Sequence, residues 1–236
     1  MSKYKIKKIM RKLIVILSII TANSFAQELK RTFNLKDFDK LDMGSSFIIS
    51  VTQANDYKIE VRGREQDVKD LIAKVSSDNT LELRYPSNWS GWKNHKEVFI
   101  TITMPKLTGA EFSGASKSNV SGFSSDNLAI EVSGASSATF NVNAKKLSLD
   151  CSGASGLKII GDGQSMNAEI SGASNINAFD FKVSSANVDA SGASDAKVYV
   201  TSKIIASASG ASSVRYKGGA SVTSNTSGAG SVKSVN

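Results

Sequence analysis

A tetrapeptide, Ser-Gly-Ala-Ser, recurs at near-regular intervals through the second half of the chain. Its copies begin at Ser113, Ser133, Ser152, Ser171, Ser191 and Ser209, and a variant, Ser-Gly-Ala-Gly, begins at Ser227. The steps between copies are 20, 19, 19, 20, 18 and 18 residues. A unit of this length cannot bury an apolar face alone, whereas stacked copies can. A fixed period of roughly 20–50 residues is therefore typical of solenoid proteins.

Apolar and polar residues alternate around each copy, which is the period of a β-strand. Most positions one and three before the motif, and five and seven after its first serine, are apolar. All four positions share one parity, so we expect them to point into the fold. The same parity turns the glycine and the second serine of the motif inward, and its first serine and alanine outward. The residues directly before the motif are Phe112, Val132, Cys151, Ile170, Ala190 and Ala208.

This pattern predicts an all-β protein, a parallel β-helix (β-solenoid) with coils of about 19 residues stacked ~4.8 Å apart. A left-handed hexapeptide helix would repeat an aliphatic residue every six positions, which this chain does not. A calcium-binding nonapeptide roll would repeat Gly-Gly-x-Gly-x-Asp, which only Gly161-Asp162-Gly163 resembles. We expect the motif at a corner, or at a pinched edge where only small side chains fit.

Residues 1–26 have the organisation of a cleaved signal peptide. Six basic residues and no acidic ones accompany the apolar run Leu13–Ile20, and Ser24-Phe25-Ala26 forms a small-x-small cleavage site. That run is too short to span a membrane, and no second one follows. Cleavage leaves 23 basic and 21 acidic residues, so the formal charge falls from +8 to +2. We therefore expect an exported protein, in the periplasm, at the cell surface or outside the cell, without a nucleic-acid partner.

The remaining chain changes composition near residue 105. Residues 27–105 predict a β-rich N-terminal section that caps the solenoid and is continuous with it, and residues 106–236 predict the repeat β-helix. One short helix is expected at Glu65–Ala73. Alternation predicts strands at Phe47–Thr52, Tyr57–Arg62, Leu81–Tyr85 and Val98–Met104.

Trp89 and Trp92 lie together in a loop, Tyr85–His95, that is rich in Pro, Ser, Asn and Gly. Exposed aromatic rings are contact surfaces for sugars and proteins, so this loop is a candidate ligand contact. The alternative is a lid folded over an open end of the solenoid, because solenoid ends need capping.

The motif series and the segment Met104-Pro105-Lys106-Leu107 that leads into it resemble an exported bacterial family, the putative auto-transporter adhesin "head GIN domain" family. The resemblance covers about residues 35–236. It implies a right-handed parallel β-helix similar to that of pectin lyases, without their catalytic residues, and a role in adhesion. It implies no particular functional residue here.

The residues offer little for catalysis. His95 is the only histidine, so a histidine pair for a metal is absent, and neither a Gly-x-Ser-x-Gly elbow nor a phosphate-binding loop occurs. Cys151, the only cysteine, falls in an inward apolar column and is expected to be structural. We predict a protein that is not an enzyme and has no cofactor.

One column of acidic residues stands out, two positions before each motif and with outward parity. In register these carboxylates would line one face, and they suggest a strip that binds a divalent cation such as calcium, or glycan hydroxyls. A solvated face is the plainer alternative. The column consists of Glu111, Glu131, Asp150, Glu169 and Asp189, followed by Ser207. Six positions after the motif start stand Asn119, Thr139, Lys158, Asn177, Lys197 and Arg215, whose cations we expect on the same face, neutralising part of the strip.

These observations favour an exported, non-enzymatic β-helix that presents an extended face for adhesion, to a glycan or a cell-surface protein. The alternative is a polysaccharide-acting enzyme of the pectin-lyase type, for which the acidic column is the candidate centre. An ice- or crystal-binding face would need threonine columns that the outward serines and alanines do not provide.

Overall fold

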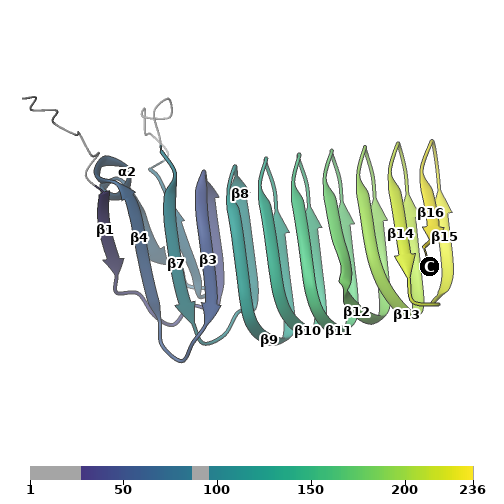
Figure 1. The fold of residues 1–236 in the computed structure, drawn as a ribbon, viewed down its shortest axis with the longest axis horizontal. Helices are drawn as coiled ribbons and strands as arrows, with labels where there is room; N and C mark the ends of the chain where they lie inside the picture. Colours follow the sequence, from purple (N-terminus) through teal and green to yellow (C-terminus); the bar gives the residue numbers. More distant parts are fainter. Residues whose placement is uncertain (1–27, 87–95, 236) are drawn as a thin grey trace, which may run out of the picture.

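The computed structural model describes residues 28–86 and 96–235, which form a flattened β-solenoid with sharp turns along one edge and broader bends along the other (Figure 1). The two broad faces are named here the front sheet and the back sheet. The first half of each long strand, β9 to β13, lies in the front sheet, and its second half continues round the broad bend into the back sheet. The long strands are β9 (Lys117–Val132), β10 (Ser137–Cys151), β11 (Gly156–Ile170), β12 (Asn175–Ala190) and β13 (Asp195–Ala208).

Shorter strands extend both sheets at each end. The front sheet adds β1 (Glu28–Phe33), β4 (Lys58–Arg64), β7 (Val98–Met104) and β3 (Phe47–Gln53) before β9, and β14 (Ser213–Lys217) and β16 (Ser231–Ser234) after β13. The back sheet adds β5 (Ile72–Val75), β6 (Thr80–Arg84), β2 (Lys40–Ser45) and β8 (Gly109–Gly114) before β9, and β15 (Ser221–Thr226) after β13. Neighbouring coils pair in parallel, and antiparallel pairing joins β1 to β4, β4 to β7 and β5 to β6. The N-terminal strands therefore continue the two sheets of the repeat region.

The four strands expected before the repeat are present: β7 has the predicted bounds, and the bounds of the other three differ by one or two residues. The helix is shorter than predicted: α2 covers only Glu65–Lys69, and the expected extension to Ala73 is wrong. Ile72 and Ala73 instead pair with Arg84 and Leu83 in the antiparallel edge of the back sheet. The backbone N–H and C=O groups of these residues therefore form hydrogen bonds within the sheet instead of within a longer helix.

The predicted inward columns form the core. The residues directly before each motif are at most 2% exposed, and Phe112 and Phe140 of different coils stack with ring centroids 6.1 Å apart. Cys151 is fully buried in this column, as expected, and its thiol donates to the carbonyl of Asn175. Burial of a leucine- or phenylalanine-sized side chain stabilises a fold by ~1.5–3 kcal/mol, so the repeated columns provide the main apolar driving force.

The motif forms the sharp turns, but the inward direction predicted for its glycine is wrong. Gly153 adopts a φ of +77°, which breaks the strand alternation, and its backbone is exposed. A Cβ built on it would lie 2.5 Å from the carbonyl oxygen of Gly134 in the preceding coil. The glycine therefore permits close contact between neighbouring backbones rather than filling the core.

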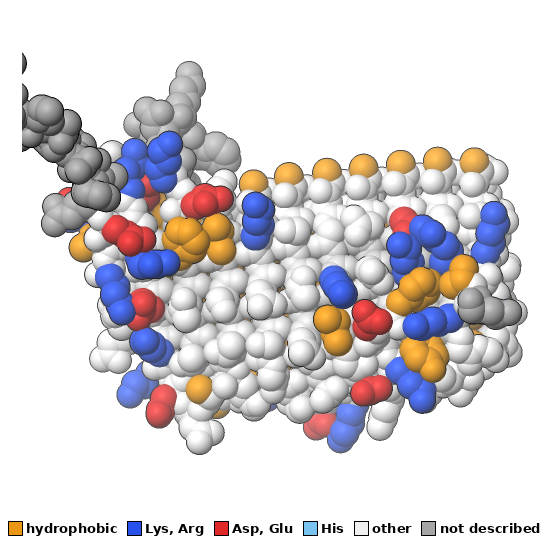
Figure 2. Space-filling view, in the orientation of Figure 1, with side chains coloured by type: hydrophobic (Ala, Val, Ile, Leu, Met, Phe, Trp, Pro, Cys, Tyr) orange, Lys and Arg blue, Asp and Glu red, His pale blue; other side chains and the backbone are white. Residues whose placement is uncertain are grey.

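Stacking of the turns is reinforced by a hydrogen bond in every coil. The amide of Ala154, for example, donates to the carbonyl of Gly134 at 2.8 Å, and the same bond recurs from Ala135 to Ala229. The alanines point outward, as predicted, and form a row of small apolar groups along the turn edge (Figure 2).

The second serine of each motif points inward, as predicted, and is at most 3% exposed. In the later coils its hydroxyl satisfies backbone groups of the tight turn: Ser212 donates to the carbonyl of Ala190 at 2.8 Å, and Ser136 accepts from the amide of Ser116 at 3.3 Å. In the first coil the Ser116 hydroxyl is buried without a hydrogen-bond partner among the described residues. A buried polar group needs such partners, which explains why a serine recurs at this position.

We predict that Gly153→Ala destabilises the protein more than Gly219→Ala. Both glycines have a φ near +76°, which costs an alanine about 1–2 kcal/mol, but a Cβ at Gly219 would meet nothing within 4 Å. Free energies of unfolding from denaturant titration measure the difference, which isolates the coil-to-coil contact. Equal losses would contradict the role assigned to the turn.

Candidate binding face

The acidic column is in register on the back sheet, as its spacing predicted. Glu111 pairs with Glu131, Glu131 with Asp150, Asp150 with Glu169, and Glu169 with Asp189. All five side chains are exposed. They form one straight row of carboxylates across five coils, which we name the carboxylate ladder.

Two further carboxylates, Asp42 and Glu82, lengthen the ladder toward the N-terminus. Asp42 of β2 pairs with Glu111 on one side and with Glu82 of β6 on the other. Sequence reasoning missed both because they precede the first motif copy. A local signal does exist, since each stands between two buried residues, as in Leu41-Asp42-Met43, in the same way as every ladder residue of the repeat.

Positive charge compensates only the N-terminal end of the ladder. Glu82 forms ion pairs with Arg84 and with Lys74, the latter at 3.3 Å, and Arg84 lies 3.7 Å from Asp42. Glu131, Asp150, Glu169 and Asp189 have no ion pair or hydrogen bond to the described residues. Like charges ~5 Å apart repel by ~1 kcal/mol even in water, so the structure keeps an uncompensated row at an electrostatic cost.

The ladder borders an open groove of about 580 Å³ on the back sheet. Small side chains form the N-terminal part of its floor, because Gly109, Ala129 and Ser148 occupy the outward position two residues before the ladder. Asn167 occupies the same position in the next coil. The groove therefore presents carboxylate acceptors along its length, with the least side-chain bulk beside Glu111, Glu131 and Asp150.

Glu111 lines the groove, and the pKa of its carboxyl group is raised above the ordinary value. Burial is the largest cause, followed by the negative charges of Asp42 and Glu131, while Arg84 opposes the shift.

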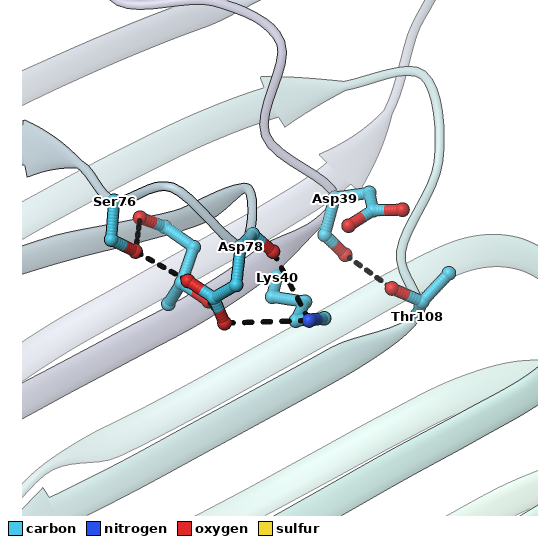
Figure 3. A network of polar contacts seen from close by, with 6 residues as sticks. Asp39, Lys40, Ser76, Asp78 and Thr108 are labelled. Atoms are coloured by element: carbon cyan, nitrogen blue, oxygen red, sulfur yellow. Dashed lines mark hydrogen bonds and ion pairs between the residues drawn. The ribbon is translucent and has the colours of Figure 1, made fainter.

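A hydrogen-bonded turn closes the N-terminal end of the groove (Figure 3). The Asp78 carboxylate accepts hydrogen bonds from the hydroxyls of Ser76 at 2.6 Å and Thr80 at 2.9 Å, and Lys40 Nζ lies 3.4 Å from Asp78 Oδ2. These contacts, the hydroxyls first, lower the pKa of Asp78 to about 2. The turn is thereby held rigidly against β2, next to the start of the ladder.

The cation column does not face the ladder, so its predicted neutralising role is wrong. Asn119, Thr139 and Lys158 are in register in the first halves of the long strands, on the front sheet. The motif turn reverses the chain, so outward positions before and after it face in opposite directions. The cations pair locally instead, Lys158 with Asp180 at 3.9 Å and Arg215 with Asp195 at 2.6 Å.

The two predicted tryptophan contacts, Trp89 and Trp92, lie outside the described residues. Burial raises the pKa of the Cys151 thiol to about 11, which suits a structural cysteine. In the described ranges, no set of three or more His, Cys, Asp or Glu side chains is grouped to hold a metal ion, and no helix there is long and apolar enough for a membrane crossing.

Comparison with known proteins identifies the family. The model of the putative auto-transporter adhesin, head GIN domain, matches residues 37–220. The chain belongs to this family. The resemblance predicted from the motif series is thereby confirmed, and so is the fold class. No curated protein matches the chain.

Solved structures agree with this assignment. A putative adhesin from Bacteroides fragilis is 27% identical, with a TM-score of 0.84, covering 89% of this chain and 97% of its own. A putative adhesin from Parabacteroides merdae, 17% identical with a TM-score of 0.69, covers 90% and 98% and shares the fold. A protein from Parabacteroides distasonis described as a putative lipid binding protein, 19% identical with a TM-score of 0.65, covers 90% and 98%. Family and fold together support an adhesin-like surface protein.

The raised pKa of Glu111 predicts a pH dependence of stability. The folded state holds this proton more tightly than the unfolded chain, whose pKa is near 4.5. Stability from this group is therefore fully present below pH 4.5 and is lost as the pH rises through the folded pKa. Glu111→Gln should remove that decline and raise stability at neutral pH, by less than ~1 kcal/mol because solvent screens a partly exposed group.

Thermal unfolding of Glu111→Gln between pH 4 and pH 8 measures this effect. Glu97→Gln, at an exposed glutamate away from the ladder, provides the matched control and should follow the parent protein. A Glu111→Gln variant that is less stable than the parent at neutral pH would contradict this prediction, because the charged carboxylate would then stabilise the fold.

Proposed function

We propose that the protein is an exported, non-enzymatic adhesin that contacts a surface ligand through the groove and carboxylate ladder of the back sheet. The observation that carries the proposal is the uncompensated part of the ladder, from Glu131 to Asp189. Like charges directly opposite one another destabilise a sheet. A partner that supplies hydrogen-bond donors or positive charge along the row would relieve this repulsion.

The solenoid suits binding by many similar contacts. Each of the five coils from Glu111 to Asp189 adds one carboxylate at a fixed spacing, so a long ligand gains contacts in proportion to the length of ladder that it covers. Glycan hydroxyls and the ammonium or amide groups of a surface protein are donors that a carboxylate accepts from. Linked weak contacts of this kind give high avidity without a deep pocket. Adhesion in the periplasm, at the cell surface or outside the cell is consistent with this arrangement.

Replacing three ladder carboxylates by amides should weaken ligand binding while leaving the fold intact. The variant Glu131→Gln/Asp150→Asn/Glu169→Gln should lose at least tenfold in affinity in a glycan-array and cell-binding screen. Its melting temperature should stay equal or rise, because repulsion is removed. The matched control is Asp56→Asn/Asp126→Asn/Asp162→Asn, three exposed carboxylates outside the ladder. Unchanged binding by the ladder variant would refute the proposed face, and cleavage of a polysaccharide by the parent protein would refute the non-enzymatic role.

Calcium is proposed only as a weak, screening ligand of the ladder. Calcium sites use six to eight oxygen ligands, whereas this row presents its carboxylates singly along a straight line. Calcium and magnesium at equal ionic strength should therefore change the melting temperature to the same small extent. A calcium-specific rise of several degrees, lost in Asp150→Asn/Glu169→Gln, would show a dedicated site instead.

A further inference from the structure

The front sheet loses its regular repeat at β12. Pairing with β13 skips from Ala178 to Lys182, so three residues of β12 have no counterpart. Of these, Phe181 is fully buried and its ring lies over Gly163, where a Cβ would come within 2.9 Å of it. Phe179 remains partly exposed on the outer face. The single Gly161-Asp162-Gly163 segment thus accommodates this bulge and has no relation to a calcium-binding roll.

Cations and aromatic rings gather around the bulge. The Lys217 Nζ atom lies 4.9 Å from the ring centroid of Tyr199 and 5.3 Å from that of Phe179, and Lys182 Nζ lies 6.0 Å from Tyr199. Figure 2 shows this cluster toward the C-terminal end of the front sheet. We name it the front patch, and its members are Lys158, Phe179, Lys182, Lys197, Tyr199, Arg215 and Lys217.

Positive charge is in excess on the front patch. Two carboxylates, Asp180 and Asp195, ion-pair with Lys158, Lys197 and Arg215. Lys182 and Lys217 contact rings instead of carboxylates among the described residues. Contact with a ring restrains a lysine without neutralising it, so less side-chain freedom is lost when an anion binds.

The two broad faces of one molecule are therefore complementary. Lys182 and Lys217, the two patch cations without a carboxylate partner among the described residues, stand in register two coil steps apart, with Tyr199 between them. Glu131 and Glu169 stand two coil steps apart on the opposite face. Both rows take their spacing from the same stacked coils. A second copy laid face to face can thus match several charges at once without any distortion, and packed sheets ~10 Å apart leave room for lysine, arginine and glutamate side chains to meet.

We propose that the front patch of one copy binds the carboxylate ladder of a second copy, which joins the molecules through opposite faces. This inference rests on the proposed function, since it names the partner of the ladder. The contact is heterologous, because each copy uses a different face, so every bound pair still offers one free patch and one free ladder. Such contacts give open stacks rather than closed dimers, a form suited to adhesion between like surfaces. Salt should weaken it through screening.

Paired charge reversal tests this inference. The patch variant is Lys182→Glu/Lys197→Glu/Lys217→Glu, and the ladder variant is Asp150→Lys/Glu169→Lys/Asp189→Lys. In sedimentation velocity at low salt, the parent protein should associate with increasing concentration and become monomeric at high salt. Each variant alone should remain monomeric, because its two faces now carry the same sign. An equimolar mixture should associate again. The far-UV circular dichroism spectrum of each variant alone should match that of the parent, which shows that both variants are folded.

A control variant, Lys58→Glu/Lys69→Glu/Lys106→Glu, changes the net charge equally away from the front patch and should associate like the parent. A parent protein that stays monomeric at low salt, or a mixture that fails to associate, overturns the inference. If the patch variant loses binding to polygalacturonate while self-association persists, the front patch binds an anionic glycan instead. Ladder-dependent binding to cells without self-association would leave the proposed function standing and this inference refuted.

Discussion

The contact between stacked glycine turns is the interaction on which the rest of this structure depends. Each motif glycine sits so near the preceding turn that no side chain fits between them, and the next amide donates to the carbonyl it approaches. A side chain at this position would force the coils apart. With glycine, each turn packs at the same distance from the preceding turn. A buried serine, such as Ser212, donates a hydrogen bond to a backbone carbonyl of the turn.

Register follows from that contact, and surface chemistry follows from register. A slip of one residue would exchange the inner and outer side chains of a strand, whereas stacked turns place equivalent residues of successive coils directly above one another. Columns in the sequence thereby become straight rows on a face. The same turn reverses the chain, so the rows before and after it lie on opposite sides. One short motif thus separates the acidic face from the basic one.

Much of this arrangement could be predicted from the sequence because strand parity has only two outcomes. Parity correctly placed the core columns, the buried serine and the carboxylate ladder. It failed for the glycine, since a positive φ interrupts alternation and parity assumes extended backbone. It also failed for the cation column, because parity says whether a residue faces out but not on which of two sheets.

The other differences arise where the repeat is irregular. Asp42 and Glu82 join the ladder through pairing of β2 with β6 and β8, strands far apart along the chain that share no motif. The front patch depends on three unpaired residues of β12. Aligning the chain on the motif does not reveal where such a bulge occurs or to which face it directs a ring such as that of Phe179. Such interruptions make one part of an otherwise uniform surface different from the rest.

The central claim is that stacked turns hold the ladder in a straight, in-register row. Nitroxide labels at Glu111→Cys and Asp189→Cys, in a Cys151→Ser background, test it by pulsed electron–electron double resonance, which measures the distance between the two labels. Four coil steps separate these residues, and at ~4.8 Å per step the account predicts one narrow distribution near ~19 Å of backbone separation. A broad distribution, or one centred well beyond this distance, would contradict the stacked register and the functional surfaces derived from it.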